Sequence, residues 1–438
     1  MRYVSQLAIA GVLIATPLFA QENTRPQAGP EQPDISALLL KIRNLEDRIT
    51  AMEGEMRQFK DLQVAAQPVP PVTASAPAPV APPTPPAAAS TPYLGTAAAG
   101  ASAQQPAALG GAESSAAKAL NPDISAIGDF IGVAGHNPVQ PSPSLQMHES
   151  EMGLQAILDP YARGDFFFSF GEQGVGLEEG YITFTALPYG FVAKAGKIRS
   201  AFGKVNTMHN HALPWVDRPL ATYNLAGGED GINDAGFSIQ RILPAPKGVF
   251  LEATAQLFRG DSADVFTASS KSDLSQVVHL RGYKDITEST NLDLGFSYAR
   301  GHNDLGSSFL TQLYGMDATL RWKPLRRSIY HSFILRSEFI WSQREQLPDD
   351  QSAFGFYASA DYQLGRRWFL GGRYDRSGRS RVAGDTDEGG SLVLTYSPSE
   401  FSQVRGQYRF TRYAGNMDTH ELLMQVLFSL GAHGAHPF

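Results

Sequence analysis

Over residues 121–438, polar and apolar residues alternate in repeated segments of 9 to 14 residues. One segment puts Tyr314, Met316, Leu320 and Trp322 on the same face, with polar or small residues between them. Successive side chains point to opposite faces of a strand, so this pattern predicts a β-strand with one apolar face. The aromatic apolar face favours strands with lipid outside and water inside over a soluble β-sandwich, whose polar face should be rich in Lys and Glu.

The connections between these segments alternate in length. Seven short ones, such as Asp159 to Pro160 and Ser397 to Glu400, are separated by eight longer ones. Fifteen connections join sixteen strands, and an even strand number with both ends in the periplasm is typical of bacterial outer-membrane barrels. The sequence therefore predicts an all-β fold over residues 121–438: an antiparallel transmembrane β-barrel of about 16 strands.

The first 20 residues predict a secretory signal peptide. Arg2 gives a positive start, an apolar run extends from Leu7 to Leu18, and Ala20 is a small residue before the predicted cleavage site. The apolar run is too short to cross about 30 Å of hydrocarbon, which disfavours a membrane anchor. The exported chain contains no cysteine, so neither disulfides nor thiolate metal sites hold its fold.

Residues 34–66 predict a coiled coil. Apolar residues recur in steps of three and four from Ile35 to Phe59, and the flanking positions pair opposite charges, as in Lys41 with Glu46. This pattern favours a parallel homo-oligomer, with one amphipathic helix packed on its own domain as the alternative.

Residues 67–120 consist mainly of Pro, Ala, Ser and Gly with almost no charge. Such a segment cannot bury a core, so we expect an extended or disordered linker. In this interpretation the coiled coil and the linker both lie in the periplasm.

Composition and motifs exclude several function classes. A net charge of -7 and a pI near 5.8 argue against a nucleic-acid partner. The chain has no nucleophile elbow, no zinc-protease motif and no phosphate-binding P-loop, so we expect no enzymatic activity.

The longest connection, from Ser200 to Asp234, is the third extracellular loop. Its length indicates a functional role, and its apolar residues favour an ordered loop folded into the barrel, where it would constrict the channel. The residues expected to act there are His209, His211, Trp215, Asp217, Arg218, Glu229 and Asp230.

Charges of both signs occupy the predicted lumen face of the strands. We expect the acidic residues Asp217, Glu229 and Asp230 of the loop to face arginines of this wall, and Arg405, Gln407 and Arg409 to attract anions. The predicted lining residues are Arg281, Asp317, Arg321, Arg336, Glu338, Arg373, Asp375, Arg405 and Arg409.

His209 and His211 flank Asn210, so in an extended segment both side chains would point the same way. They could share a zinc ion, with Asp217 or Glu229 as a third ligand. The alternative is that both histidines are hydrogen-bonding loop residues without a metal.

Several segments carry a resemblance to a known family. Residues 178–187 (EEGYITFTAL) and 196–206 (GKIRSAFGKVN) resemble phosphate-selective porin O and P type channels. Residues 121–130 (NPDISAIGDF), 209–220 (HNHALPWVDRPL) and the end FSLGAHGAHPF resemble an uncharacterised branch of that group, sometimes labelled zinc-regulated outer-membrane receptors. The resemblance implies a trimeric channel constricted by its third loop, whereas Ile and Leu in the coiled coil favour a dimer, so both states stay open.

Three functions follow as hypotheses. The first is a water-filled outer-membrane porin for small hydrophilic solutes or ions. The second is a structural tether from the outer membrane to peptidoglycan through the coiled coil and linker. The third is zinc uptake or binding at His209 and His211.

Overall fold

The computed structural model describes residues 122–172 and 174–431. The predicted signal peptide, coiled coil and linker, residues 1–20, 34–66 and 67–120, lie outside the described residues. Within the described ranges, no helix combines the length and the apolar character needed to cross a membrane.

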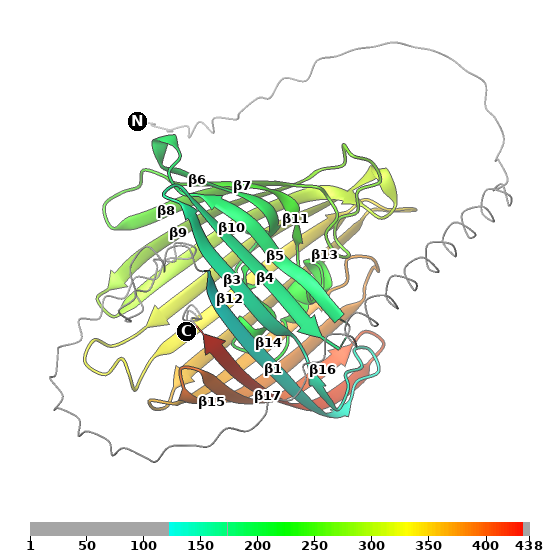
Figure 1. Cartoon of the computed structure of the whole chain (residues 1–438). Coiled ribbons are helices and arrows are strands. Elements are labelled where there is room, and N and C mark those ends of the chain that lie inside the picture. The colour runs from blue at the N-terminus through cyan, green and yellow to red at the C-terminus, as the bar shows by residue number, and fades with distance from the viewer. Residues whose placement is uncertain (1–121, 173, 432–438) are drawn as a thin grey trace, which may run out of the picture. The chain divides into compact units, whose positions relative to one another are not determined.

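The strands form one closed antiparallel barrel (Figure 1). Ring closure comes from β1 (Asp123–His136), which pairs with β17 (Met417–Gly431) on one side. On its other side β1 pairs with β2 (Leu145–Met147) and β3 (Ser150–Asp159), which share the second position. The described residues therefore form sixteen strands around the ring, which confirms the predicted fold. The others are β4 (Ala162–Gly171), β5 (Gly174–Phe184), β6 (Phe191–Arg199), β7 (Asn233–Ile242), β8 (Val249–Phe258), β9 (Ser275–Thr287), β10 (Thr290–Asn303), β11 (Gly306–Trp322), β12 (Phe333–Arg344), β13 (Gln351–Gln363), β14 (Trp368–Gly378), β15 (Thr386–Ser399) and β16 (Ser402–Tyr413).

Several connection lengths differ from expectation, among them the predicted long loop from Gly171 to Gly176, where β4 and β5 stay paired up to Gly171 and Gly174. The predicted long loop from Gly301 to Ser308 is a tight hairpin, because the ladder between β10 and β11 continues to Asn303 and Gly306. At the opposite end, β11 and β12 are joined by residues 323–332, longer than the predicted turn. Polar residues beyond the alternating segment can either extend a ladder or form a loop, so the sequence pattern did not separate these two cases.

Side chains alternate between the two faces of each strand. On β16, Val404 and Tyr408 are 38% and 46% exposed and point outward, whereas Arg405, Gln407 and Arg409 are buried inside the ring. This alternation follows from the period of two in a strand. The outer surface is therefore apolar, and the polar face lines an interior that we call the lumen.

Candidate functional site: a loop packed inside the barrel

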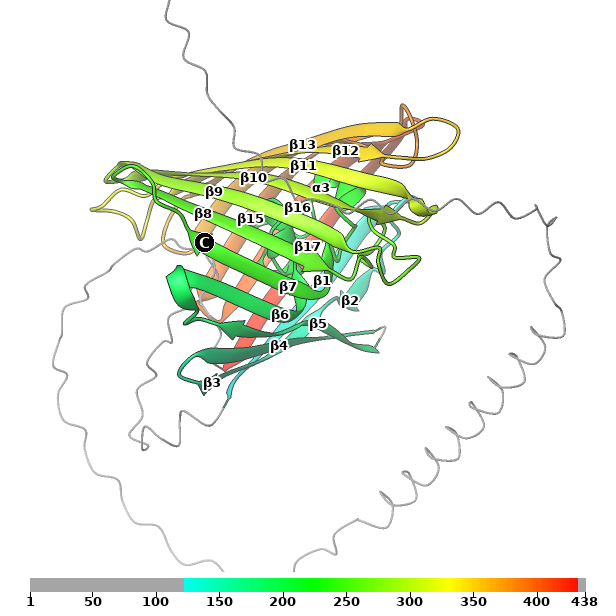
Figure 2. The same ribbon diagram turned by 90° about the horizontal axis from the view of Figure 1, so that it is seen from above.

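Residues 200–232, which join β6 to β7, fold into the lumen, and we call them the inner loop. They contain the 3-10 turns η2 (Val205–Thr207) and η3 (Asn210–Ala212) and the short helix α3 (Leu220–Leu225). Helix α3 contacts β12, β13, β14 and β15, and Figure 2 shows it enclosed by the strands. This long, apolar loop therefore lies inside the ring of strands, as its length and apolar residues predicted.

The centre of the inner loop is an apolar cluster. The ring of Trp215 is 1% exposed and packs edge-on against Tyr357 of β13, with ring centroids 5.2 Å apart. Leu213 and Val205 of the loop and Val393 of β15 complete the cluster. Burial of these side chains favours the docked loop, because an outward loop would leave them in water.

A second apolar cluster surrounds α3. Loop residues Phe202, Ala221, Leu225 and Ile232 pack there against the barrel wall. The wall residues occupy lumen-facing positions, where an aqueous channel favours polar side chains, and the sequence analysis did not single them out. Apolar residues on the polar face of a strand are the signal that would have located the docking surface. On the wall these residues are Phe258, Val277, Ala299, Leu313 and Ile340.

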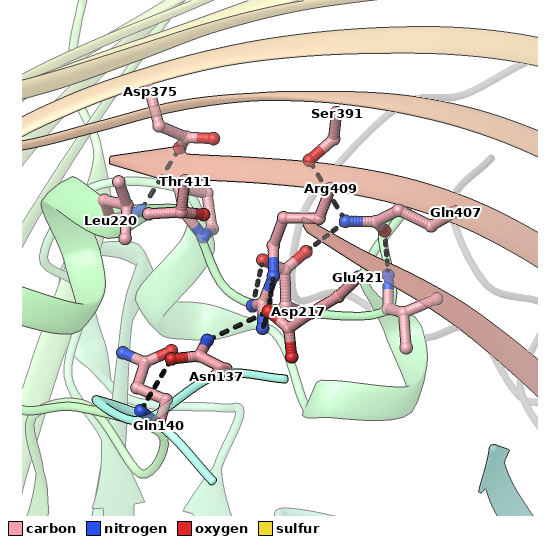
Figure 3. A network of polar contacts seen from close by, with 12 residues as sticks. Asn137, Gln140, Asp217, Leu220, Asp375, Ser391, Gln407, Arg409, Thr411 and Glu421 are labelled. Atoms are coloured by element: carbon pink, nitrogen blue, oxygen red, sulfur yellow. Dashed lines mark hydrogen bonds and ion pairs between the residues drawn. The ribbon is translucent and has the colours of Figure 1, made fainter. Parts of the chain in front are cut away.

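Asp217 anchors the loop to the arginine side of the wall (Figure 3). Its Oδ2 lies 3.0 Å from Arg373 Nη2 and 2.9 Å from Arg409 Nη1, and its Oδ1 accepts a hydrogen bond from Gln407 at 2.5 Å. Burial by itself raises the pKa of Asp217, but the two guanidinium groups outweigh it and lower this pKa to about 2. The carboxylate is therefore ionised at neutral pH.

The loop backbone is held by the same wall. Arg405 Nη1 donates to the carbonyl of Trp215 at 3.1 Å, and the amide of Val216 donates to Gln407 Oε1 at 2.8 Å. Arg409 also contacts Asp217 of the loop. The inner loop is therefore bound by all three of the side chains expected to attract anions, Arg405, Gln407 and Arg409. These side chains face the docked loop.

A second attachment lies on β10 and β12. The amide of Gly203 donates to Ser297 Oγ at 2.9 Å, and Lys204 Nζ lies 3.3 Å from Asp293 Oδ2. Gly203 has a φ of +64°, and a Cβ there would lie 1.7 Å from Glu338 Oε1. Only glycine suits this conformation and this close approach, so Gly203 lets the loop enter the lumen against β12.

A third attachment reaches the opposite wall, on β3 and β5. His209 Nδ1 contacts Glu151 of β3, and His209 Nε2 lies 2.8 Å from Glu179 Oε2 of β5. Burial by itself lowers the pKa of His209, but the carboxylates of Glu178, Glu151 and Glu179 hold it well above its usual value. With contacts on β3, β5, β10, β12 and β16, the inner loop crosses the lumen from wall to wall.

Glu229 and Asp230 do not bind the arginines of β12, β14 and β16, contrary to expectation. Glu229 Oε1 lies 2.8 Å from His148 Nε2, between β2 and β3, and the carbonyl of Asp230 accepts a hydrogen bond from Arg199 at 2.6 Å. The reason is topological: the loop must return to β7, whose first residue, Asn233, pairs with Arg199 at the end of β6.

Arg218 forms hydrogen bonds with other residues of the inner loop. Its Nε donates to Asn210 Oδ1 at 2.8 Å, and its Nη2 donates to the carbonyl of Met208 at 2.9 Å. The residue is 6% exposed, and these hydrogen bonds compensate the buried charge and stabilise the loop conformation.

Most of the predicted lining residues form ion pairs along the wall. Arg281 binds Asp293 of β10 with two hydrogen bonds of 2.9 and 2.7 Å, and Arg373 Nε lies 2.6 Å from Asp375 Oδ2. Arg409 is shared between Asp217 and Glu421, as Figure 3 shows. Arg321 of β11 and Arg336 of β12 also form ion pairs, with Asp293 at 3.8 Å and with Asp361 at 2.5 Å. The other predicted residues on this face are Asp317 of β11, Glu338 of β12 and Arg405 of β16.

The two histidines lie together, but with a different third residue from the one expected. Their rings are 5.6 Å apart, and η3 replaces the extended segment that the spacing had suggested. His211 Nδ1 lies 3.6 Å from Glu151 Oε2, whereas Asp217 and Glu229 bind elsewhere. Glu151 precedes His209 by 58 residues, so no local spacing could identify it.

The chain and its structure were compared with known proteins and known structures. No family model matches the chain. A protein of Aquifex aeolicus (strain VF5), described only as uncharacterized, is 26% identical over 385 residues, covering 73% of this chain and 81% of that protein. The structure is similar to a loop L8 deletion mutant of OmpT, an outer membrane protein of Vibrio cholerae, with a TM-score of 0.50 and 7% identity over 71% of this chain and 99% of that one. The outer membrane channel DcaP of Acinetobacter baumannii gives a TM-score of 0.49 and 11% identity, over 74% of this chain and 100% of that one.

Proposed function

We propose that this chain forms a water-filled diffusion channel for small hydrophilic solutes or ions in an outer membrane. The observation that carries this proposal is a closed ring of sixteen strands with an apolar outer face and a charged inner face. Barrels of 16 to 18 strands leave room for an aqueous channel, whereas barrels of about 8 strands are filled by their own side chains.

Aromatic side chains on the outer face support insertion in a bilayer. On β11, Tyr314 and Trp322 are 40% and 36% exposed and lie eight residues apart on the same face. At about 3.3 Å per residue and a tilt of about 40°, they are separated by roughly 20 Å along the barrel axis. This is close to the apolar band of about 25 Å between the aromatic girdles of outer-membrane barrels.

The inner loop is the proposed constriction. It carries charged groups between the two walls, because His209 binds Glu151 and Glu179 on β3 and β5 while Asp217 binds Arg373 and Arg409 on β14 and β16. Opposed charges in a narrow pore sort ions by sign and size. The loop would therefore set both conductance and selectivity.

Deletion of residues 207–230 tests this role. We expect higher single-channel conductance in planar bilayers and weaker ion selectivity, because the segment that crosses the lumen is removed. A matched deletion of residues 380–384, in the loop between β14 and β15, should leave both quantities near the wild-type values. Unchanged conductance in the first deletion would show that the inner loop does not limit the ion path.

The finer assignments stay predictions. They are membership of the phosphate-selective porin group, assembly as a homotrimer and contact with peptidoglycan. The tether hypothesis depends on the coiled coil and linker, which lie outside the described residues. Ion permeation by a chain lacking residues 34–120 would separate a channel from a tether.

A further inference from the structure

Glu151, His209 and His211 place three metal-ligand atoms together at the wall of β3. We propose that these residues bind a divalent first-row transition cation such as Zn²⁺, and that the bound cation ties the inner loop to the barrel. One ligand atom from each side chain lies within 4.8 Å of the other two. The proposal rests on these side chains and holds whether or not the barrel conducts ions.

The separations suit a small tetrahedral cation. Ligand atoms around Zn²⁺, with bonds of about 2.0 to 2.1 Å, lie about 3.3 to 3.4 Å apart. Glu151 Oε2 is 3.6 Å from His211 Nδ1, close to this separation, and it also contacts His209 Nδ1. A small rotation of the His209 or Glu151 side chain would lengthen the contact between His209 Nδ1 and Glu151 Oε2 enough to admit the ion.

The ligand types select the class of cation. Two imidazole nitrogens and one carboxylate oxygen, with one position left for water, form a common zinc site, whereas Ca²⁺ and Mg²⁺ prefer oxygen ligands. His209 also has the outer contact typical of metal-bound histidines, because its Nε2 is held 2.8 Å from Glu179 Oε2 while its Nδ1 faces the site. Such a carboxylate orients the ring and makes it a stronger ligand.

The surrounding charge favours a cation. The side chains of Glu151 and His211 are 3% and 4% exposed, and that of His209 is 14% exposed. Glu178 Oε2 lies 3.5 Å from His209 Nδ1, so a further carboxylate adjoins the site, next to Glu179. Arg199 pairs with Glu178, and a divalent ion that displaced the proton of His209 would add one further positive charge between Glu151 and Glu179.

Calorimetric titration of the full chain with ZnCl₂ tests the site. The chain carries no histidine tag, is folded in detergent, and is treated with a chelator and dialysed beforehand. We expect the variant with both His209→Gln and His211→Gln to bind one equivalent fewer of Zn²⁺ than wild type. We expect Glu151→Gln to weaken that equivalent at least tenfold.

His279→Gln is the matched control, because His279 also faces the lumen, where it bonds Ser297 Oγ at 2.8 Å on the other side of the barrel. This variant should keep the wild-type stoichiometry and affinity. Circular dichroism and the heat-dependent gel shift of folded barrels establish that each variant is folded. A zinc X-ray absorption spectrum with two imidazoles and oxygen ligands is expected for wild type and not for the double variant.

The proposal also predicts slower proteolysis of the inner loop when Zn²⁺ is added to wild type, with no such effect in the double variant. Equal zinc stoichiometry and affinity in wild type and the double variant would overturn it, as would protein that binds no zinc. Conductance without zinc binding would refute this site alone, and zinc binding without conductance would refute the channel alone.

Discussion

Replacing Asp217 by Asn tests whether the inner loop controls ion selectivity. The carboxylate lies 3.0 Å from Arg373 and 2.9 Å from Arg409, and it also accepts a hydrogen bond from Gln407. Asn has nearly the same shape and keeps an oxygen acceptor, so the substitution removes one negative charge from the lumen while largely conserving packing. We expect the channel to become more selective for anions.

The size of this effect follows from the charge removed. An ion that passes about 6 Å from a unit charge in a water-like medium has an interaction energy of about 0.7 kcal/mol. Screening at about 0.1 M salt roughly halves this energy, which leaves a factor of about 2 in the local concentration of each ion. Because the anion gains and the cation loses, their permeability ratio should shift about three- to fourfold.

The assay is the reversal potential of the open channel in a planar bilayer with a KCl gradient. Asp304→Asn is the control, since Asp304 also pairs with two arginines, Arg344 and Arg381, but lies between β10 and β11, outside the inner loop. Its effect on the permeability ratio should be clearly smaller. An unchanged ratio in Asp217→Asn, or an equal change in both variants, would refute the assignment of the constriction to this loop.

Three further predictions concern loop docking. Trp215→Ala should lower the free energy of unfolding by about 3 to 5 kcal/mol in detergent, measured with denaturant, because the indole is 1% exposed. Gly203→Ala should displace the start of the loop and raise its cleavage by protease, since the new Cβ would meet a carboxylate oxygen of β12 at 1.7 Å. Burial lowers the pKa of His148, but hydrogen bonds and charges from Asp129 and Glu229 outweigh it and raise this pKa to about 10. Its contribution to loop docking is therefore fully present below pH 6.5 and lost as pH rises through about 10, so protection of the loop should fall near pH 10 in wild type and show no such step in His148→Gln.

The barrel could be predicted from the sequence because strand alternation is a local property. On β11 the residues from Tyr314 to Trp322 alternate between lipid and lumen as their order in the chain requires. The strand count followed from connections that each lie between two neighbouring strands. The tight hairpin at Asn303 and Gly306 was missed because a polar sequence is compatible with either a ladder or a loop.

The candidate site could be predicted only in part. Length and apolar content single out residues 200–234, and strand parity identifies which charged side chains face the lumen. Neither shows which wall residue each loop residue meets. Leu313 and Ile340 were overlooked because they look like ordinary strand residues until their parity is compared with that of Asp317 and Glu338.

By itself, the sequence determined the strands, the two faces of each strand and the presence of a loop too apolar to lie in water. The tertiary structure decided that Asp217 binds Arg373 and Arg409, that Glu229 binds His148, and that Glu151 joins the two histidines. The physical reason is ring closure, which brings strands distant in sequence around one loop. Contacts across the lumen depend on the path of the loop within the closed barrel, and the spacing of residues along the sequence does not determine that path.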